Sequence, residues 1–315
     1  MSWWPYEECD FYAPGSVLHL PFVRIGASGL PAFGQSTWNF VSHARIWNSG
    51  SLLGNSFSRL DWWKGNDAAD LQYESQLIGH GSMATGPTRR DAYWTLTSSP
   101  AFFGRRRNFI LSVEDWAGEW ISHGISSEEC NRLVDCDAFM LFLTPTRPYE
   151  ELQDHAMPKF EAFFSQLKAH RKAIKQPVDV PVAIAMPMLD VVPASVPPEI
   201  VSRAEQLICE IRSSGPMNEA TTLAAMQRRH QLAMELSRGV TPLPRLVSIC
   251  ESVASPIRVR VFPMATLGWS AATHETLGTL GPWKAHQHLL KTSFGILDPI
   301  LWVLHQLGLR RLPAA

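Results

Sequence analysis

The sequence predicts an α/β fold with a mostly parallel sheet, one antiparallel edge strand and helices on both faces. Two apolar runs, residues 138–144 (AFMLFLT) and 180–186 (VPVAIAM), are unbroken, which is typical of parallel strands buried on both faces. Helical stretches alternate with the strands, and a glycine-rich turn follows the first strand. This alternation predicts a sheet whose carboxyl ends carry the ligand-binding loops.

The other elements follow from local patterns in chain order. A first strand is expected at 17–25 and a helix at 36–47, which Asn48-Ser49-Gly50 ends. Residues 51–90 lack sustained periodicity and are interpreted as a long loop. Later elements are a hairpin of strands 91–98 and 108–114, a helix at 149–175, mostly helical residues at 197–239, a strand at 257–262 and a final helix. We interpret residues 1–315 as a single domain with insertions at about 51–90 and 197–245.

Composition narrows the function classes. The formal net charge of −1 implies no bulk electrostatic attraction to nucleic acid or to a membrane. The five cysteines are scattered and form no C-x-x-C, which argues against a disulfide framework or structural zinc and favours the reducing cytoplasm. The N-terminus lacks the pattern of a signal peptide. The apolar stretch 294–309 is too short to span a membrane, so we expect a core helix with Pro299 in its first turn.

The glycine-rich turn at residues 29–36 has the spacing of a phosphate-binding P-loop. Gly29 and Gly34 would let backbone N–H groups surround phosphate oxygens, and the following helix N-terminus adds positive partial charge. Ser36 is placed to bind Mg²⁺, and Gln35 stands where such a loop carries lysine. The alternative is an ordinary glycine turn before a helix.

Three further segments lie at predicted strand ends. Asp115, with Gly118 three residues later, could hold the Mg²⁺ shell and meet a γ-phosphate. Asp190 follows the strand that ends at residue 186 and could bond a guanine edge, or could cap a turn. The last segment, residues 265–268 (ATLG), could close on the base.

This order of motifs resembles the Ras-like, translation-factor-related class of P-loop GTPases. More narrowly, it resembles the bacterial double-GTPase group, whose members are often encoded beside a second GTPase-like partner in conflict and immunity loci. The hairpin before DWAGE (115–119) and the ending LDPILWVLHQL (297–307) are part of this resemblance, which covers roughly residues 17–305.

The resemblance implies roles for individual residues. Ser36, Asp115 and Thr88 would face Mg²⁺, with Thr85 as a rival to Thr88. Glu119 would occupy the water-positioning, catalytic place, although it could instead be a solvated acid at a helix start. The implied cofactors are GTP or GDP with Mg²⁺. The implied nucleotide-binding residues are Gly29, Gly34, Gln35, Ser36, Thr37, Gly118, Asp190, Ala265 and Thr266.

Three departures from the family pattern set two hypotheses apart. Gln35 removes the lysine charge, Pro187 and Met188 replace two guanine-selective residues, and Ala265 replaces a serine. A nearby arginine could compensate for the lysine; the candidates are Arg24, Arg45 and Arg89. The sequence favours a pseudo-GTPase, a structural or regulatory subunit that binds a protein partner in a bacterial complex such as an anti-phage system. The alternative is a GTP/GDP-binding switch with slow Mg²⁺-dependent hydrolysis.

Basic and histidine-rich runs elsewhere are interpreted as surface. His286-Gln287-His288 has no partner acid or cysteine nearby in sequence, so we expect surface histidines rather than a metal site. The run Arg228-Arg229-His230 lies in a helical stretch and is expected on an exposed helix face.

Overall fold

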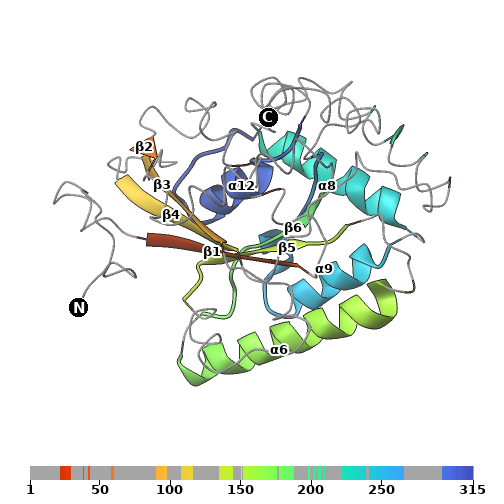
Figure 1. Cartoon of the computed structure of the whole chain (residues 1–315), viewed down its shortest axis with the longest axis horizontal. Helices are drawn as coiled ribbons and strands as arrows, with labels where there is room; N and C mark the ends of the chain where they lie inside the picture. The colour runs from red at the N-terminus through yellow and green to blue at the C-terminus, as the bar shows by residue number, and fades with distance from the viewer. Residues whose placement is uncertain are drawn as a thin grey trace.

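The computed structural model describes the sheet and most of the helices that cover it (Figure 1). The described residues are 22–29, 38, 42, 58–59, 90–97, 108–115, 135–144, 150, 152–175, 177–187, 198, 202, 205, 206, 209, 222–238, 241–265 and 293–314.

Within these residues, one sheet has the strand order β2-β3-β4-β1-β5-β6-β7. Five neighbouring strands, β4, β1, β5, β6 and β7, are parallel, whereas β3 runs antiparallel to β4 and β2 antiparallel to β3. The predicted α/β architecture is therefore confirmed. The bounds are β1 Phe22–Gly29, β2 Ser58–Arg59, β3 Arg90–Thr97, β4 Asn108–Asp115, β5 Ala138–Phe142, β6 Val182–Met186 and β7 Val259–Pro263.

The prediction of one antiparallel strand at the sheet edge does not hold as stated. The antiparallel strand β3 is next to the edge, because the two-residue strand β2 pairs with it at Trp94 and Thr95. The first strand also differs from its predicted range of 17–25, since β1 extends to Gly29 through the sequence GASG. Glycine and serine are poor strand formers, but here β4 and β5 pair with both sides of β1, and this pairing overrides local preference.

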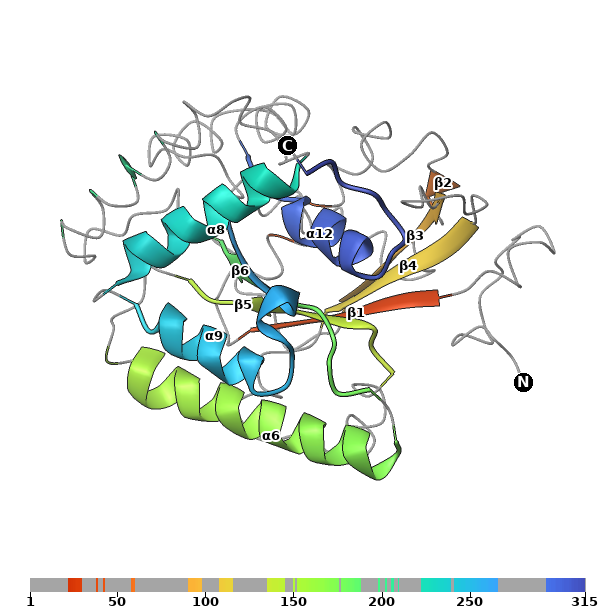
Figure 2. The same cartoon turned by 180° about the vertical axis from the view of Figure 1, so that it is seen from behind.

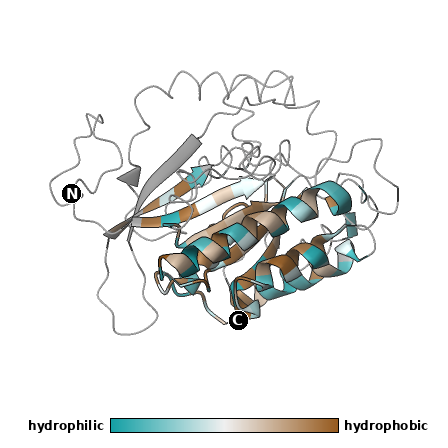
Figure 3. Ribbon diagram, turned by 90° about the horizontal axis from the view of Figure 1, so that it is seen from below, coloured by the Kyte–Doolittle hydropathy of each residue, from teal (hydrophilic) through white to brown (hydrophobic). Residues whose placement is uncertain are grey.

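Helices cover both faces of the sheet (Figures 1 and 2). On one side lie α6 (Met157–Ala173), which follows the π-helical turn η2 (Leu152–Ala156), and α9 (Leu243–Glu251). On the other side lie α8 (Leu223–Ser237) and α12 (Asp298–Gln306). A short 3-10 turn, η3 (Pro256–Arg258), leads into β7. Figure 3 shows hydrophilic and hydrophobic residues alternating along the helices, as expected where one side covers a sheet and the other meets water.

Aromatic side chains fill both interfaces between sheet and helices. Phe139 of β5 meets Phe163 and Phe164 of α6 in edge-to-face contacts, with ring centroids 6.3 and 6.4 Å apart. On the opposite face, Phe262 of β7 packs on Trp302 of α12 at 5.6 Å. Such pairs add roughly 0.5–1.5 kcal/mol beyond the area that they bury.

Two helices test the sequence predictions differently. The final helix is confirmed: α12 begins at Asp298, carries Pro299 in its first turn and is buried through Leu304. In contrast, α9 was not predicted, because Pro242 and Pro244 at its start resemble loop punctuation. Proline is tolerated in the first turn of a helix, where its missing N–H is not needed. No helix in the described part of the chain is long and apolar enough to cross a membrane.

Candidate functional site

Strand order places a topological switch point at the carboxyl ends of β1 and β5, where a ligand-binding crevice is expected. After β1 the chain continues on the side of β3 and β4, whereas after β5 it continues on the other side, to β6 and β7. Ligands of open parallel sheets bind where neighbouring connections diverge in this way. Gly29 is paired with Phe142 at this point, and Ala27 is paired with Asp115 at the end of β4. The main chains of Gly29 and Asp115 therefore lie at the same edge of the sheet.

Gly29 is required by strand packing, whatever the ligand. A Cβ atom at this position would lie 2.8 Å from Cβ of Phe142 and 3.2 Å from its carbonyl oxygen. The 2.8 Å contact is closer than a side chain tolerates, and the 3.2 Å contact is tight against a main-chain oxygen, so β1 and β5 would have to move apart. The packing of β1 against β5 is therefore sufficient to explain why glycine occupies the first position of the P-loop-like spacing.

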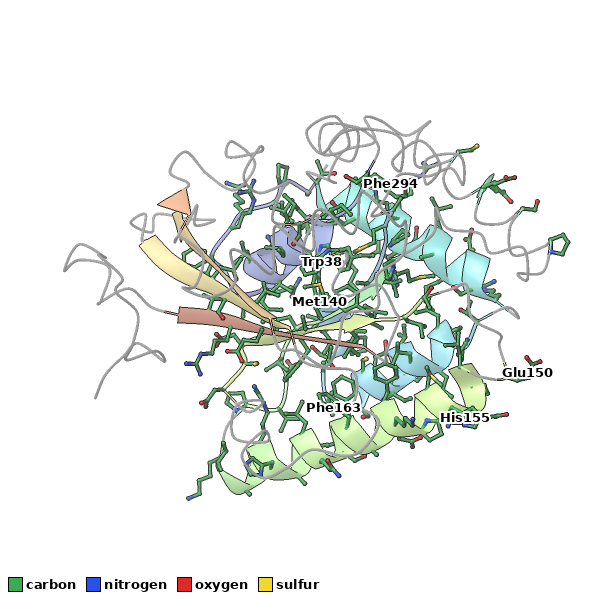
Figure 4. All side chains as sticks on the ribbon, viewed as in Figure 1. Trp38, Met140, Glu150, His155, Phe163 and Phe294 are labelled. Carbon is green, nitrogen blue, oxygen red and sulfur yellow. The ribbon has the colours of Figure 1, made fainter. Side chains whose placement is uncertain are left out.

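Trp38 fixes the start of the helix predicted at 36–47. It is in helical conformation, fully buried, and donates a hydrogen bond from Nε1 to the carbonyl oxygen of Ile296 at 2.9 Å. Its ring also lies 5.4 Å from that of Phe142. Figure 4 shows Trp38 on the side of the sheet that α12 covers. Sequence reasoning missed this anchor, because its partner is 258 residues away along the chain.

At the end of β7, backbone groups of the predicted base loop are already paired. The N–H of Ala265 donates to the carbonyl oxygen of Phe294 at 3.2 Å, and the N–H of Phe294 donates to Ala265 at 3.1 Å. The N–H of Met264 donates to the carbonyl oxygen of Met186 at 3.0 Å. Met186, Met264, Ala265 and Phe294 are all buried, and so is Pro187. The described residues at the ends of β6 and β7 therefore form an apolar, internally paired surface.

Gly295 lets the chain turn close to β7. It has φ +66°, and a Cβ atom there would lie 2.8 Å from the carbonyl oxygen of Pro263. Three residues later, Asp298 forms a buried ion pair with Arg229 of α8, with Nη1 and Oδ2 2.6 Å apart. The side chain of Arg229 is only 8% exposed and that of Asp298 only 1%. This pair holds the segment behind Ala265 against α8.

The expectation that Arg228, Arg229 and His230 form an exposed helix face is wrong for two of them. Arg228 is exposed, but Arg229 is buried and His230 is half-buried. The N–H of Val261 in β7 donates to Nδ1 of His230 at 3.1 Å. Burial and the nearby charge of Arg260 lower the pKa of His230 from 6.5 to about 4. Arg229 and His230 face inward because α8 packs against β7, the outer strand of the described sheet.

Arg24 is not placed to replace the missing P-loop lysine. Its guanidinium lies 3.9 Å from the carboxylate of Glu114 and 3.5 Å from that of Asp135, and its backbone N–H donates to the carboxylate of Asp137 at 2.9 Å. It lies five residues before Gly29, roughly 16 Å along an extended strand. Arg24 therefore joins β1 to the start of β5 at the opposite end of the sheet.

Most other predicted site residues lie outside the described residues, and for Asp115 only the main chain is described. Within the described part, no group of three or more histidine, cysteine, aspartate or glutamate side chains is arranged to hold a metal ion. The site residues outside the described part, with the alternative arginines, are Gly34, Gln35, Ser36, Thr37, Arg45, Thr85, Thr88, Arg89, Gly118, Glu119, Asp190 and Thr266.

Comparisons with known proteins give a fold-level likeness only. No protein-family model and no curated protein sequence matches the chain. Among solved structures, it is similar to a chain of the signal recognition particle receptor SRb-GTP/SRX complex from Chaetomium thermophilum. That match has 14% sequence identity and a TM-score of 0.34, and it covers 84% of this chain and 97% of the other.

Proposed function

We propose that this chain is a degenerate P-loop GTPase-like protein that acts as a structural or regulatory subunit beside a protein partner. The observation that carries this proposal is a difference at the carboxyl edge of the sheet between its phosphate side, at β1 and β4, and its base side, at β6 and β7. The main chains of Gly29 and Asp115 lie at the same edge of the sheet, which supports a phosphate and Mg²⁺ site there, whereas the base side, at Ala265, is paired and apolar.

On the phosphate side, the geometry is compatible with a phosphate and its metal ion. Gly29 ends β1 at this switch point, where a phosphate-binding turn would be expected to follow. Ser36, Thr88 and Asp115 are the residues that would hold Mg²⁺, whose chemistry is to neutralise charge on phosphate oxygens. Gln35 offers an amide where the family carries an ammonium group, so this chain would stabilise a transferring phosphoryl group less well.

On the base side, the described residues do not suit a guanine edge. Recognition of a base needs polar groups that are free to bond its edge. The N–H of Ala265 is donated to Phe294, and Met186 and Pro187 are buried and apolar. Of the predicted base-side residues, only Asp190 and Thr266 would then be left to select guanine. This supports a protein that has kept the GTPase-like fold but does not hydrolyse GTP selectively.

The resemblance to the double-GTPase group suggests the class of partner. We propose that a second GTPase-like protein binds this chain in a bacterial complex, with defence against phage as its setting. In this proposal residues 1–315 act as one domain, and the stretches 51–90 and 197–245 carry features specific to the complex. Part of the second stretch, α8, packs on β7.

Nucleotide retention tests the proposal directly. The protein is purified, denatured, and any released nucleotide is identified by chromatography, while unfolding is followed with GTP, GDP and ATP plus Mg²⁺. A ligand at 100 times its dissociation constant stabilises the folded state by about 2.7 kcal/mol, a clear thermal shift. We expect no stoichiometric nucleotide and no selective shift with GTP. Stoichiometric GDP or GTP, with hydrolysis above background, would contradict the proposal and establish the switch.

The switch remains the second candidate because Gly29 and Asp115 lie together at the crevice. Replacing Gln35→Lys restores the charge that the family places on the β- and γ-phosphates. If the crevice binds nucleotide, the variant should bind GTP about tenfold or more tightly, as measured by calorimetry. Gln35→Met, which removes the amide and keeps an uncharged, flexible side chain of similar length, is the matched control. An unchanged affinity in both variants means that the crevice does not bind nucleotide phosphates.

A further inference from the structure

Arg260, like Arg310, is a partly buried arginine that lacks a carboxylate partner among the described residues. It forms no ion pair with a described carboxylate, and its buried Nε has no hydrogen-bond partner. Burial is the only cause that lowers the pKa of Arg260. The arginines that do have such partners form the pairs Arg24–Glu114, Arg229–Asp298, Arg245–Glu161 and Arg258–Asp179.

The guanidinium of Arg260 lies on an aromatic ring. Its Cζ is 5.8 Å from the ring centroid of Trp302 in α12, and Trp302 is itself held against Phe262. Trp302 is fully buried, and its Nε1–H has no partner. A planar guanidinium that rests on an indole loses little further freedom when it binds an oxyanion through its fork of N–H groups.

His230 brings a third N–H group to the same place from α8. Its Nδ1 accepts the hydrogen bond from Val261, so the neutral ring carries its proton on Nε2. The charge of Arg260 reaches His230, because it contributes to lowering the pKa of this ring. Arg260 of β7 lies on Trp302 of α12, and His230 of α8 is bonded to Val261, the residue next to Arg260. Each of the three elements thus carries an N–H donor in this part of the fold, where no described carboxylate forms an ion pair with Arg260.

We propose that Arg260, Trp302 and His230 form an oxyanion-binding site between β7, α8 and α12. The ligand is a phosphate or carboxylate group from outside the described chain, either a free small anion or an acidic side chain of a partner. Arg260 is the second residue of β7, and Ala265 lies five residues further on, roughly 16 Å along the strand. The site is therefore separate from the carboxyl-edge crevice and stands independently of the function proposed there.

Titration of the full chain by NMR tests this site. Inorganic phosphate and a hexaglutamate peptide are added at constant ionic strength, with chloride as the reference. We follow the indole N–H signal of Trp302, assigned by its loss in Trp302→Phe, and the titration of His230. Both should respond saturably, and the bound anion should raise the pKa of His230 above about 4. A response to phosphate alone identifies a small-anion site, and a tighter response to the peptide identifies a partner's acidic segment.

Arg258→Met is the matched control, since Arg258 lies two residues before Arg260 but is paired with Asp179. Arg260→Met should weaken binding about tenfold or more, whereas Arg258→Met should leave it unchanged. Arg260→Lys keeps the charge without the fork and should bind more weakly than wild type, which provides a test if Arg260→Met fails to fold. The proposal is overturned if neither probe gives a saturable response, or if a folded Arg260→Met protein binds as tightly as wild type.

Discussion

At the amino end of the parallel sheet, hydrogen bonds and ion pairs near the surface join neighbouring loops. Asp137 receives the N–H of Arg24, and Asp179 receives the N–H of Ser255 at 2.8 Å. Arg171 of α6 donates to two loop carbonyl oxygens, those of Cys136 and Pro177. These contacts join the start of β1 with the segments that precede β5, β6 and β7, and the bond from Arg171 to Cys136 is the buried one among them.

At the carboxyl end of the sheet, neighbouring segments are instead held together by close backbone packing and one buried ion pair. Gly29 packs against Phe142, Ala265 pairs with Phe294, and Arg229 binds Asp298 out of contact with water. The same chemistry, arginine with aspartate, therefore occurs at both ends in different surroundings. The difference predicts that mutations at the carboxyl end will cost more stability than equivalent mutations at the amino end.

The largest effect is expected for Asp298→Ala. Removing one member of a buried ion pair leaves the other charge buried without compensation, which typically costs about 3–5 kcal/mol. Urea unfolding followed by circular dichroism measures the loss. A double variant, Arg229→Met with Asp298→Leu, removes both charges and should recover much of the stability. If Asp298→Ala costs under about 1 kcal/mol, the pair does not hold the carboxyl end.

A smaller loss is expected for Gly29→Ala. The new Cβ would lie 2.8 Å from that of Phe142, so β1 and β5 must move apart, at a cost of about 1–3 kcal/mol. Ser28→Ala is the adjacent control. The buried hydroxyl of Ser28 has no hydrogen-bond partner, so its removal should change the free energy of unfolding by less than about 0.5 kcal/mol. Equal stability of the two variants would show that the close approach at Gly29 is relaxed in solution.

The edge of β7 should respond to acid through His230. Its folded-state pKa of about 4 lies below the ordinary 6.5, so folding favours the neutral ring. The resulting stability is present in full above pH 6.5 and is lost as the pH falls through about 4. The slope from this one proton is at most about 1.4 kcal/mol per pH unit.

The variant His230→Gln keeps a hydrogen-bond acceptor that does not titrate. Urea unfolding between pH 7.5 and 4.5 should therefore show a shallower decline for the variant than for wild type. Parallel declines in the two proteins would mean that His230 does not carry this pH dependence.

The smallest effect is expected for Asp179→Ala at the amino end. Its side chain is 53% exposed and lies 3.6 Å from Nε of Arg258, so water and salt weaken the interaction. We expect a loss of about 1 kcal/mol or less, and a smaller loss in 0.5 M salt. A cost that matches that of Asp298→Ala would abolish the contrast between the two ends.

Local sequence patterns were sufficient to predict the central strands β5 and β6 and the final helix. Residues 138–144 and 180–186 are apolar throughout, and this continuity identifies strands that are buried on both faces whatever surrounds them. Pro299 marks the first turn of α12 in the same local way.

Features that depend on distant partners could not be predicted in this way. Trp38 bonds a carbonyl group that is 258 residues away, and Arg229 and Asp298 are 69 residues apart. Arg24 illustrates the opposite error: it is near the P-loop-like turn in sequence, yet the extended strand carries it to the other end of the sheet. The predicted roles of Gln35, Ser36 and Glu119 stay predictions.

The hydrogen bond from Val261 to His230 also bears on self-association. An outer strand presents unpaired N–H and C=O groups that can template pairing with another chain, and proteins commonly block such strands. In this chain α8 blocks β7 with a ring nitrogen that accepts a hydrogen bond only when it is unprotonated. Protonation of His230, whose pKa is lowered to about 4, removes that acceptor and leaves the N–H of Val261 without this partner. Acid is therefore expected to promote aggregation by strand addition at β7 before the core of the domain unfolds.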